Sequence, residues 1–97
     1  MKVIRNRGLL AYSDKELVDM LKESSDALTI LYEKHKDYCL NFMKSMYKDE
    51  DEIKDIFQDA LIVLYENINK SGFNLTCSIQ TYLNSICRNQ VLGIKHK

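Results

Sequence analysis

The side chains best suited to chemistry lie between residues 51 and 68, where carboxylates and an amide recur every three or four residues. On a helix of about 100° per residue, five side chains of this segment, four polar and one apolar, fall within about 60° of one direction. They are Asp55, Gln58, Asp59, Ile62 and Glu66. An apolar anchor inside an acidic rim is typical of an interface that binds a positively charged partner. The alternative is a solvated face with one exposed isoleucine, which needs no function.

A second candidate site is the pair His35 and Cys39, which are four residues apart and could offer two metal ligands, with Glu33 nearby. A zinc site needs four ligands at defined spacing, and the sequence supplies no second pair. Both residues also fall on the apolar stripe of a predicted helix, so packing in a helical bundle explains them. The chain has no glycine-rich phosphate loop and no nucleophile–base arrangement. We therefore expect no enzymatic activity, no metal and no cofactor.

Charge is segregated along the chain although the net charge is zero. All 14 acidic residues lie between Asp14 and Glu66 with seven lysines, which leaves that segment at −7. Residues 1–13 contribute +3, and residues 67–97 contribute +4 without any acid. One chain thus offers an acidic and a basic surface, which suggests two unlike partners. Ordinary scatter of surface charge is the simpler alternative.

Helices are expected to position these residues, because proline is absent, glycine is scarce and the apolar residues recur at helical period. Ser13 and Glu16 form a capping box that starts a short first helix. The polar residues 24–26 interrupt the chain and restart it as a second helix that runs to about Tyr47.

A third helix begins after the acidic residues 49–52, whose charges suit a helix N-terminus, and stops near Ser71 and Gly72. A fourth runs from about Ser78 to Leu92. The predicted inward side chains, helix by helix, are Leu17, Met20 and Leu21; Leu28, Leu31, Tyr32, His35, Tyr38, Cys39, Phe42 and Met46; Ile53, Ile56, Phe57, Ala60, Leu61, Leu64 and Ile68; Ile79, Tyr82, Leu83, Ile86 and Cys87.

The predicted fold is one compact all-α bundle of four helices, a short N-terminal one and three long ones. At 97 residues the chain has room for a single core. No apolar run approaches the roughly 18 residues of a membrane span, and the basic start lacks the features of a signal peptide. Three cysteines without CxxC spacing favour free thiols in a reducing cytoplasm.

Four ordered segments of this bundle are similar to one known family. Residues 55–65, DIFQDALIVLY, resemble the D-L/I/V-x-Q-E/D-x-F-L/I-x-L/V-W/Y core of region 2 in bacterial RNA polymerase sigma factors. Residues 13–18, SDKELV, and 27–35, ALTILYEKH, resemble the family's S-D-x-E-L-V/I and A-F/L-x-x-L-Y-x-x-Y. Residues 81–89, TYLNSICRN, resemble its T-W-L-x-x-I-A-R-N. The nearest type is the short extracytoplasmic-function (ECF) sigma factor.

The resemblance implies a sigma region 2 domain over residues 13–97, preceded by a basic extension at residues 1–12 and lacking the helix-turn-helix region 4. In this family the third helix docks on the clamp helices of the polymerase β′ subunit. Asp55, Gln58 and Asp59 match the docking positions, and Ile62 and Glu66 extend the same face.

The resemblance also implies that the fourth helix and the preceding loop hold the single-stranded, non-template minus-ten element of promoter DNA, with one base unstacked. The matching or chemically suited residues are Phe73, Asn74, Thr76, Thr81, Tyr82, Asn84, Ser85, Arg88, Asn89 and Lys95. The outward side of this helix is expected to present Thr81, Asn84, Ser85, Arg88 and Lys95, which suit phosphates. Alternatively, Phe73 only caps the core and Tyr82, which replaces the family's tryptophan, only packs inward.

Two functions therefore stay open. The first is a cytoplasmic sigma factor domain that binds the polymerase core and melts the minus-ten element. The second is a helical module that binds polymerase or another protein without melting DNA. An anti-sigma factor is a further candidate partner of the first.

Overall fold

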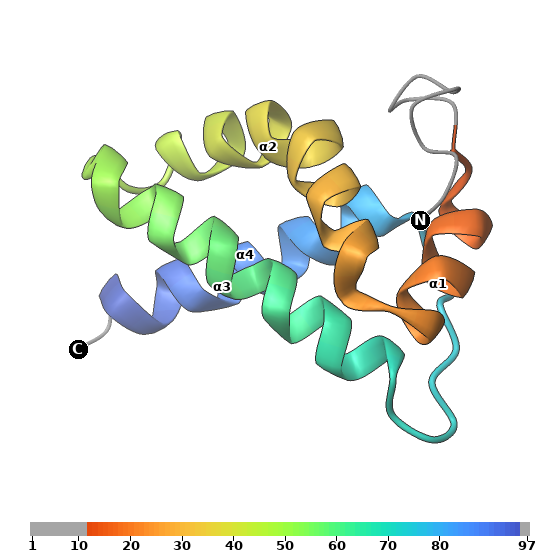
Figure 1. Ribbon diagram of the computed structural model, residues 1–97. Helices are drawn as coiled ribbons and strands as arrows, with labels where there is room; N and C mark the ends of the chain where they lie inside the picture. The colour runs from red at the N-terminus through yellow and green to blue at the C-terminus, as the bar shows by residue number, and fades with distance from the viewer. Residues whose placement is uncertain (1–11, 96–97) are drawn as a thin grey trace.

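A computed structural model describes the backbone of residues 12–95 and the side chains of residues 12–93. Its elements are α1 (Asp14–Glu23), the 3-10 turn η3 (Ser25–Ala27), α2 (Leu28–Lys44), α3 (Glu50–Ile68) and α4 (Ile79–Lys95). The predicted all-α bundle is confirmed, and residues 12–95 contain no strand. In Figure 1, α1 and the loop between α3 and α4 lie at one end of the molecule, and the C-terminal end of α4 lies at the other.

The predicted N-terminal basic extension lies outside the described residues except for Tyr12. That tyrosine is buried, and its carbonyl oxygen accepts a 2.8 Å hydrogen bond from Nζ of Lys34. Tyr12 is therefore part of the packed bundle.

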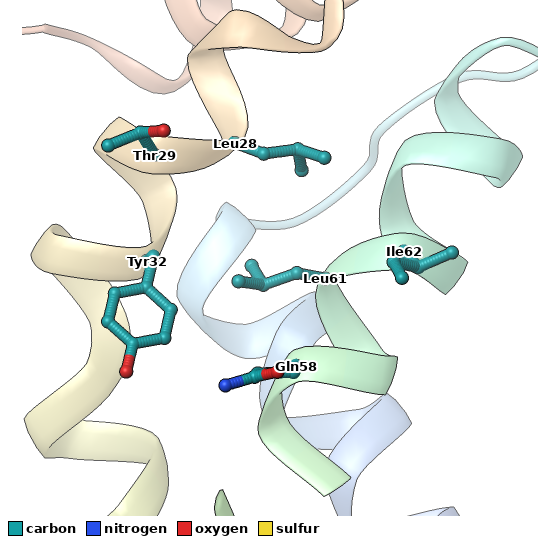
Figure 2. Close-up of a pocket in the computed structure, with 6 residues that line it drawn as sticks. All are labelled: Leu28, Thr29, Tyr32, Gln58, Leu61 and Ile62. Carbon is teal, nitrogen blue, oxygen red and sulfur yellow. The ribbon is translucent and has the colours of Figure 1, made fainter. Parts of the chain in front are cut away.

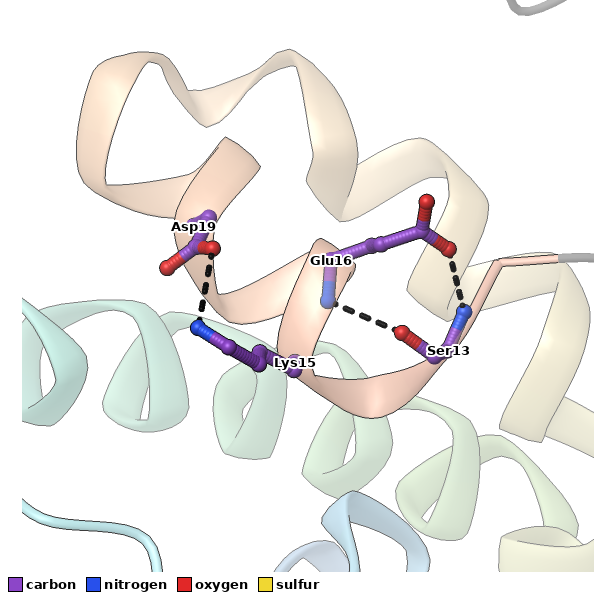
Figure 3. A network of polar contacts seen from close by, with 4 residues as sticks. All are labelled: Ser13, Lys15, Glu16 and Asp19. Atoms are coloured by element: carbon purple, nitrogen blue, oxygen red, sulfur yellow. Dashed lines mark hydrogen bonds and ion pairs between the residues drawn. The ribbon is translucent and has the colours of Figure 1, made fainter.

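Local hydrogen bonds fix where the helices begin. The capping box of α1 is confirmed: Oγ of Ser13 accepts from the Glu16 N–H at 3.1 Å, and Oε1 of Glu16 accepts from the Ser13 N–H at 2.9 Å (Figure 3). The neighbouring ion pair of Lys15 and Asp19, 3.6 Å apart, is exposed and adds little stability. The carboxylate of Asp49 caps α3 by accepting the Glu52 N–H at 3.1 Å.

The seven inward residues predicted for α3 are all buried. The whole buried core of the described residues consists of Tyr12, Leu17, Val18, Leu21, Ala27, Ile30, Leu31, His35, Cys39, Met43, Ile53, Ile56, Phe57, Ala60, Leu61, Leu64, Ile68, Ile79, Leu83, Cys87 and Val91. Since α2, α3 and α4 all contact one another, most of this core lies between the three long helices, and α1 adds Leu17, Val18 and Leu21.

Predicted inward residues of α2 need correction. Tyr38 is 60% exposed, and Ile30 and Met43 are buried instead. The buried row Leu31, His35, Cys39 and Met43 has a spacing of four residues, so it drifts slowly around the helix. Side chains at this spacing form a ridge that packs between neighbouring helices, and Tyr38 lies beside it.

Three helix ends also differ from their predicted positions. α2 ends at Lys44 rather than about Tyr47, α3 ends at Ile68 rather than near Gly72, and α4 continues past Leu92 to Lys95. Gly72 does take the left-handed conformation predicted for it, with φ of +82°.

A partly buried polar network joins α2 to α4. Nε2 of Gln80 donates to Sγ of Cys39 at 3.3 Å and to Oδ1 of Asn84 at 3.1 Å. Sγ of Cys39 in turn donates to Oδ1 of Asn84 at 3.3 Å. Oε1 of Gln80 is then left to accept from Nδ1 of His35, 2.7 Å away. This chain of donors assigns the neutral Nδ1–H tautomer to His35.

A carboxylate of α1 caps the N-terminus of α4. Oδ2 of Asp14 accepts the backbone N–H of Ile79 at 3.0 Å, across 65 residues of sequence. Ser78 adds a local cap, because its Oγ accepts the Thr81 N–H at 3.1 Å. The first turn of α4 therefore has a negative charge at its positive end although it contains no acid itself.

Asp14→Ala is expected to lower the free energy of unfolding by about 1–2 kcal/mol, because the Ile79 N–H loses a charged acceptor. Urea denaturation followed by circular dichroism measures this. Asp19→Ala is the matched control on the same helix and should change stability by less than about 0.5 kcal/mol. Equal losses in the two variants would show that the contact between Asp14 and Ile79 contributes nothing.

His35 is expected to make the fold sensitive to acid. Its side chain is 4% exposed and its Nε2 has no hydrogen-bond partner in the described part of the chain. Burial lowers the pKa of His35 from its ordinary value of 6.5, the bond to Gln80 opposes this, and the charge of Lys34 lowers it further. Below about pH 6.5 the unfolded chain binds a proton that the folded chain does not, so stability falls as pH falls from 6.5 toward the lowered pKa.

Urea midpoints measured between about pH 7 and pH 5 test this dependence, and stability above pH 7 should not change on account of His35. A His35→Gln variant lacks the titrating group and should lose less stability over the same interval. An equal loss in this variant would assign the acid sensitivity to other groups.

Candidate functional site

The face of α3 opposite its buried stripe is an exposed surface that we name the acidic ridge. It consists of Asp55, Gln58, Asp59, Ile62 and Glu66, all of them exposed. Ile62 is 50% exposed, and it and Tyr38 are the large apolar side chains that the described residues leave most open to solvent. The predicted outward orientation of this face is confirmed, whereas its role in binding polymerase stays a prediction.

A shallow groove of about 350 Å³ runs beside the acidic ridge between α2 and α3. Its lining residues are Leu28, Thr29, Tyr32, Gln58, Leu61 and Ile62 (Figure 2). The ring of Tyr32 is held by Phe57, with centroids 5.5 Å apart, and by the Lys36 ammonium, 5.3 Å from the Tyr32 centroid. The groove therefore offers apolar surface on a fixed wall next to Gln58 and Ile62.

Sequence reasoning missed the α2 wall of this groove. Leu28 and Tyr32 were both placed on the inward stripe, and both are only partly buried. Their spacing of four residues at the start of a stripe, where fewer neighbours cover a helix, was the available signal.

The exposed side of α4 carries no negative charge. Thr81, Ser85 and Arg88 are exposed, as predicted, and Asn89, whose orientation was not predicted, is exposed as well; we name these four residues the acid-free face. No acid occurs from residue 67 to the end of the chain. Hydroxyls, an amide and a guanidinium can all donate hydrogen bonds to phosphate oxygens. The side chain of Lys95, also predicted to bind DNA, lies outside the described side chains.

The predicted outward orientation of Asn84 is wrong. Its side chain is half-buried and its Oδ1 accepts from Cys39 and Gln80 in the network between α2 and α4. The physical reason is that this buried network needs an acceptor for two donors, and Asn84 supplies it. Its predicted DNA contact remains untested, and it would have to be made by groups other than Oδ1.

The loop between α3 and α4 presents polar side chains around an aromatic pair, Phe73 and Tyr82. Asn74 and Thr76 are exposed, and the two rings are half-buried. The ring centroids of the pair lie 6.0 Å apart with a tilt of 54°. Both rings pack against the core and both keep an open part, so packing and a contact with a base are compatible at each.

The end of α3 and the start of the α3–α4 loop are tied to other helices by residues that sequence reasoning did not single out. Nδ2 of Asn67 donates to the Tyr82 hydroxyl oxygen at 2.8 Å. Nδ2 of Asn69 donates to the carbonyl oxygens of Leu21 and Tyr65, at 3.4 and 3.0 Å. The contacts of Asn67 with Tyr82 and of Asn69 with Leu21 join residues 15 and 48 positions apart, so no local spacing in the sequence indicates them.

His35 and Cys39 both serve the network between α2 and α4 rather than forming an open cluster. Within residues 12–93, no three His, Cys, Asp or Glu side chains are grouped so that they could hold a metal ion. The helices of residues 12–95 are each too short or too polar to cross a lipid bilayer.

Comparison with known proteins agrees with this geometry. The family profile of sigma-70 region 2 matches residues 31–93, which is 63 of the 97 residues and includes α3, the loop and most of α4. No curated protein sequence and no solved structure matches the chain. The chain therefore belongs to the sigma-70 region 2 family, whose members are non-enzymatic transcription initiation factors that bind RNA polymerase and melt promoter DNA.

Proposed function

We propose that this chain is the region 2 domain of an ECF-type sigma factor, with the domain over residues 13–97 after a basic extension at residues 1–12, whose last residue, Tyr12, packs against the domain. It docks on the clamp helices of the polymerase β′ subunit and holds the non-template strand of the minus-ten element. The observation that carries the proposal is the acidic ridge, because its polar residues and Ile62 face solvent together on one side of α3. The polymerase and the promoter would place the protein in the cytoplasm, where an anti-sigma factor could cover the same ridge.

On the polymerase side, carboxylates of Asp55 and Asp59 pair with arginines of a cationic helix, and Gln58 fixes its register by hydrogen bonds. Ile62 becomes the desolvated centre, surrounded by these polar groups. The groove beside it receives an apolar side chain of the same helix, since Leu28, Tyr32 and Leu61 line it. Both α2 and α3 then contribute to the docking surface.

On the DNA side, the acid-free face of α4 runs along the phosphate backbone and the α3–α4 loop takes the unstacked base. Support comes from the exposure of Arg88, Thr81 and Ser85 and from the absence of acids beyond residue 66. Stacking on aromatic rings is worth about 1–3 kcal/mol per base and offsets the cost of unstacking. Phe73 and Tyr82 are the aromatic residues at this position.

The alternative is a module that docks on polymerase without melting DNA. One observation favours it: Tyr82, at the position of the family's tryptophan, is half-buried and its hydroxyl is bonded to α3. A ring that stays packed between helices separates strands less readily than a free indole.

Asp55→Ala combined with Gln58→Ala is expected to weaken binding to RNA polymerase core at least about tenfold, because the partner's buried donors lose their acceptors. Co-purification with core and a titration of labelled protein measure this. The matched control replaces an exposed acid and amide on α2, Asp37→Ala with Asn41→Ala. Both double variants should keep helicity and melting temperature. Retention of core at the wild-type level by the first variant would exclude the acidic ridge from docking.

Arg88→Ala is expected to weaken binding of a fluorescent single strand to the complex with core, and to reduce the slope of log K against log salt by about 0.7. Arg88→Lys keeps the charge and should keep most of that slope. Lys22→Ala, an exposed cation on α1, is the control and should leave the slope unchanged. If the wild-type complex binds no single strand at any salt concentration, the docking-only function is correct.

A further inference from the structure

Asn67 links three parts of the candidate DNA site. It lies in the last turn of α3 and is half-buried, and its Nδ2 donates to the hydroxyl oxygen of Tyr82 on α4 at 2.8 Å. The Tyr82 ring packs against Phe73 of the loop. An amide of α3 therefore adds a directional contact to the core packing that holds the aromatic pair.

The direction of this hydrogen bond has a chemical consequence. An amide NH₂ group can only donate, so the Tyr82 oxygen accepts and its own proton is not used in the contact. The hydroxyl has no other partner within residues 12–93. The Tyr82 O–H therefore carries a proton that no described residue accepts, at a half-buried position where a hydrogen bond discriminates well.

The first part of the α3–α4 loop, residues 69–73, is held in place by contacts within the protein. Gly72 makes its turn with φ of +82°, and the Phe73 N–H donates to the Lys70 carbonyl oxygen at 3.2 Å. Asn69 fastens the loop to α1 through the Leu21 carbonyl oxygen. A binding site whose groups are already ordered loses less conformational entropy when it binds.

We propose that Asn67 is a positioning residue: it orients Tyr82 so that the free hydroxyl proton is donated to a ring nitrogen or carbonyl oxygen of the unstacked base, which packs against Phe73. This inference rests on the proposed function. It adds a residue outside the DNA-binding set expected from the sequence and assigns to Tyr82 a hydrogen-bond donor that a phenylalanine would lack.

The test uses the complex with polymerase core and a short fluorescent single strand, selected by the wild-type complex from a random pool. Replacing each base of that strand in turn by an abasic site identifies the captured base. Tyr82→Phe and Asn67→Ala should each weaken binding of the intact strand about 2- to 10-fold. Because Asn67 acts through Tyr82, the double variant should be no weaker than Tyr82→Phe alone. On the strand that lacks the captured base, all three variants should bind like the wild type.

Asn67→Asp tests the direction of the bond. A carboxylate of the same shape keeps the link but accepts the Tyr82 proton, so none remains for the base, and discrimination against the abasic strand should fall as in Tyr82→Phe. Repulsion between the new carboxylate and DNA weakens binding of the intact strand and of the abasic strand alike. The ratio of the two affinities is therefore unaffected by it. Asn41→Ala, an exposed amide of α2 with no role in this arrangement, should retain full discrimination.

Wild-type discrimination in Asn67→Ala, or losses that add in the double variant, would overturn the inference while leaving the proposed function in place. Undiminished discrimination in Asn67→Asp would also overturn the inference. This variant provides the test if Asn67→Ala loses helicity. If the wild-type complex binds no single strand, the proposed function is wrong, and this inference, which rests on it, is wrong as well.

Discussion

Helix α3 has to bury one side of itself against α2, α4 and α1, and what the molecule presents to a partner depends on that constraint. Its buried side chains include Ile53, Phe57 and Leu64, which are 1% exposed or less. Rotation of α3 by one residue, about 100°, would carry carboxylates into the core. Unpaired charges there cost several kcal/mol each, so the apolar stripe fixes the direction of the acidic ridge. The surface that we assign to polymerase is thus oriented by the core behind it.

Helix α4 is oriented by a different kind of contact. Leu83 and Cys87 are fully buried, and a set of directional hydrogen bonds from His35 through Gln80 adds to this apolar packing. Such bonds are satisfied in one rotation of α4 only, whereas apolar packing alone tolerates small rotations. The network therefore defines which side of α4 is left for Thr81, Ser85 and Arg88. The helix proposed for polymerase is thus oriented by apolar packing, and the helix proposed for DNA by apolar packing together with directional hydrogen bonds.

The sequence was sufficient to predict features that depend on a single helix. The stripe of α3, the acidic ridge opposite to it and the capping box at Ser13 follow from spacing within a few residues, and all are present as predicted. It was insufficient to predict features that depend on contacts between two helices. Tyr38 is exposed because the side chains that α2 buries follow a row beside it, and Asn84 turns inward to meet donors on α2 and α4. Spacing within one helix cannot indicate a partner on another.

The bond between Asp14 and Ile79 makes the first and the last of the described helices interdependent. The carboxylate is made early in synthesis and its amide 65 residues later, so the bundle cannot close until α4 has been synthesised. A ligand that displaced α1 would also uncover the start of α4. A protein that displaced α1 would therefore also disturb the helix that we propose for DNA binding.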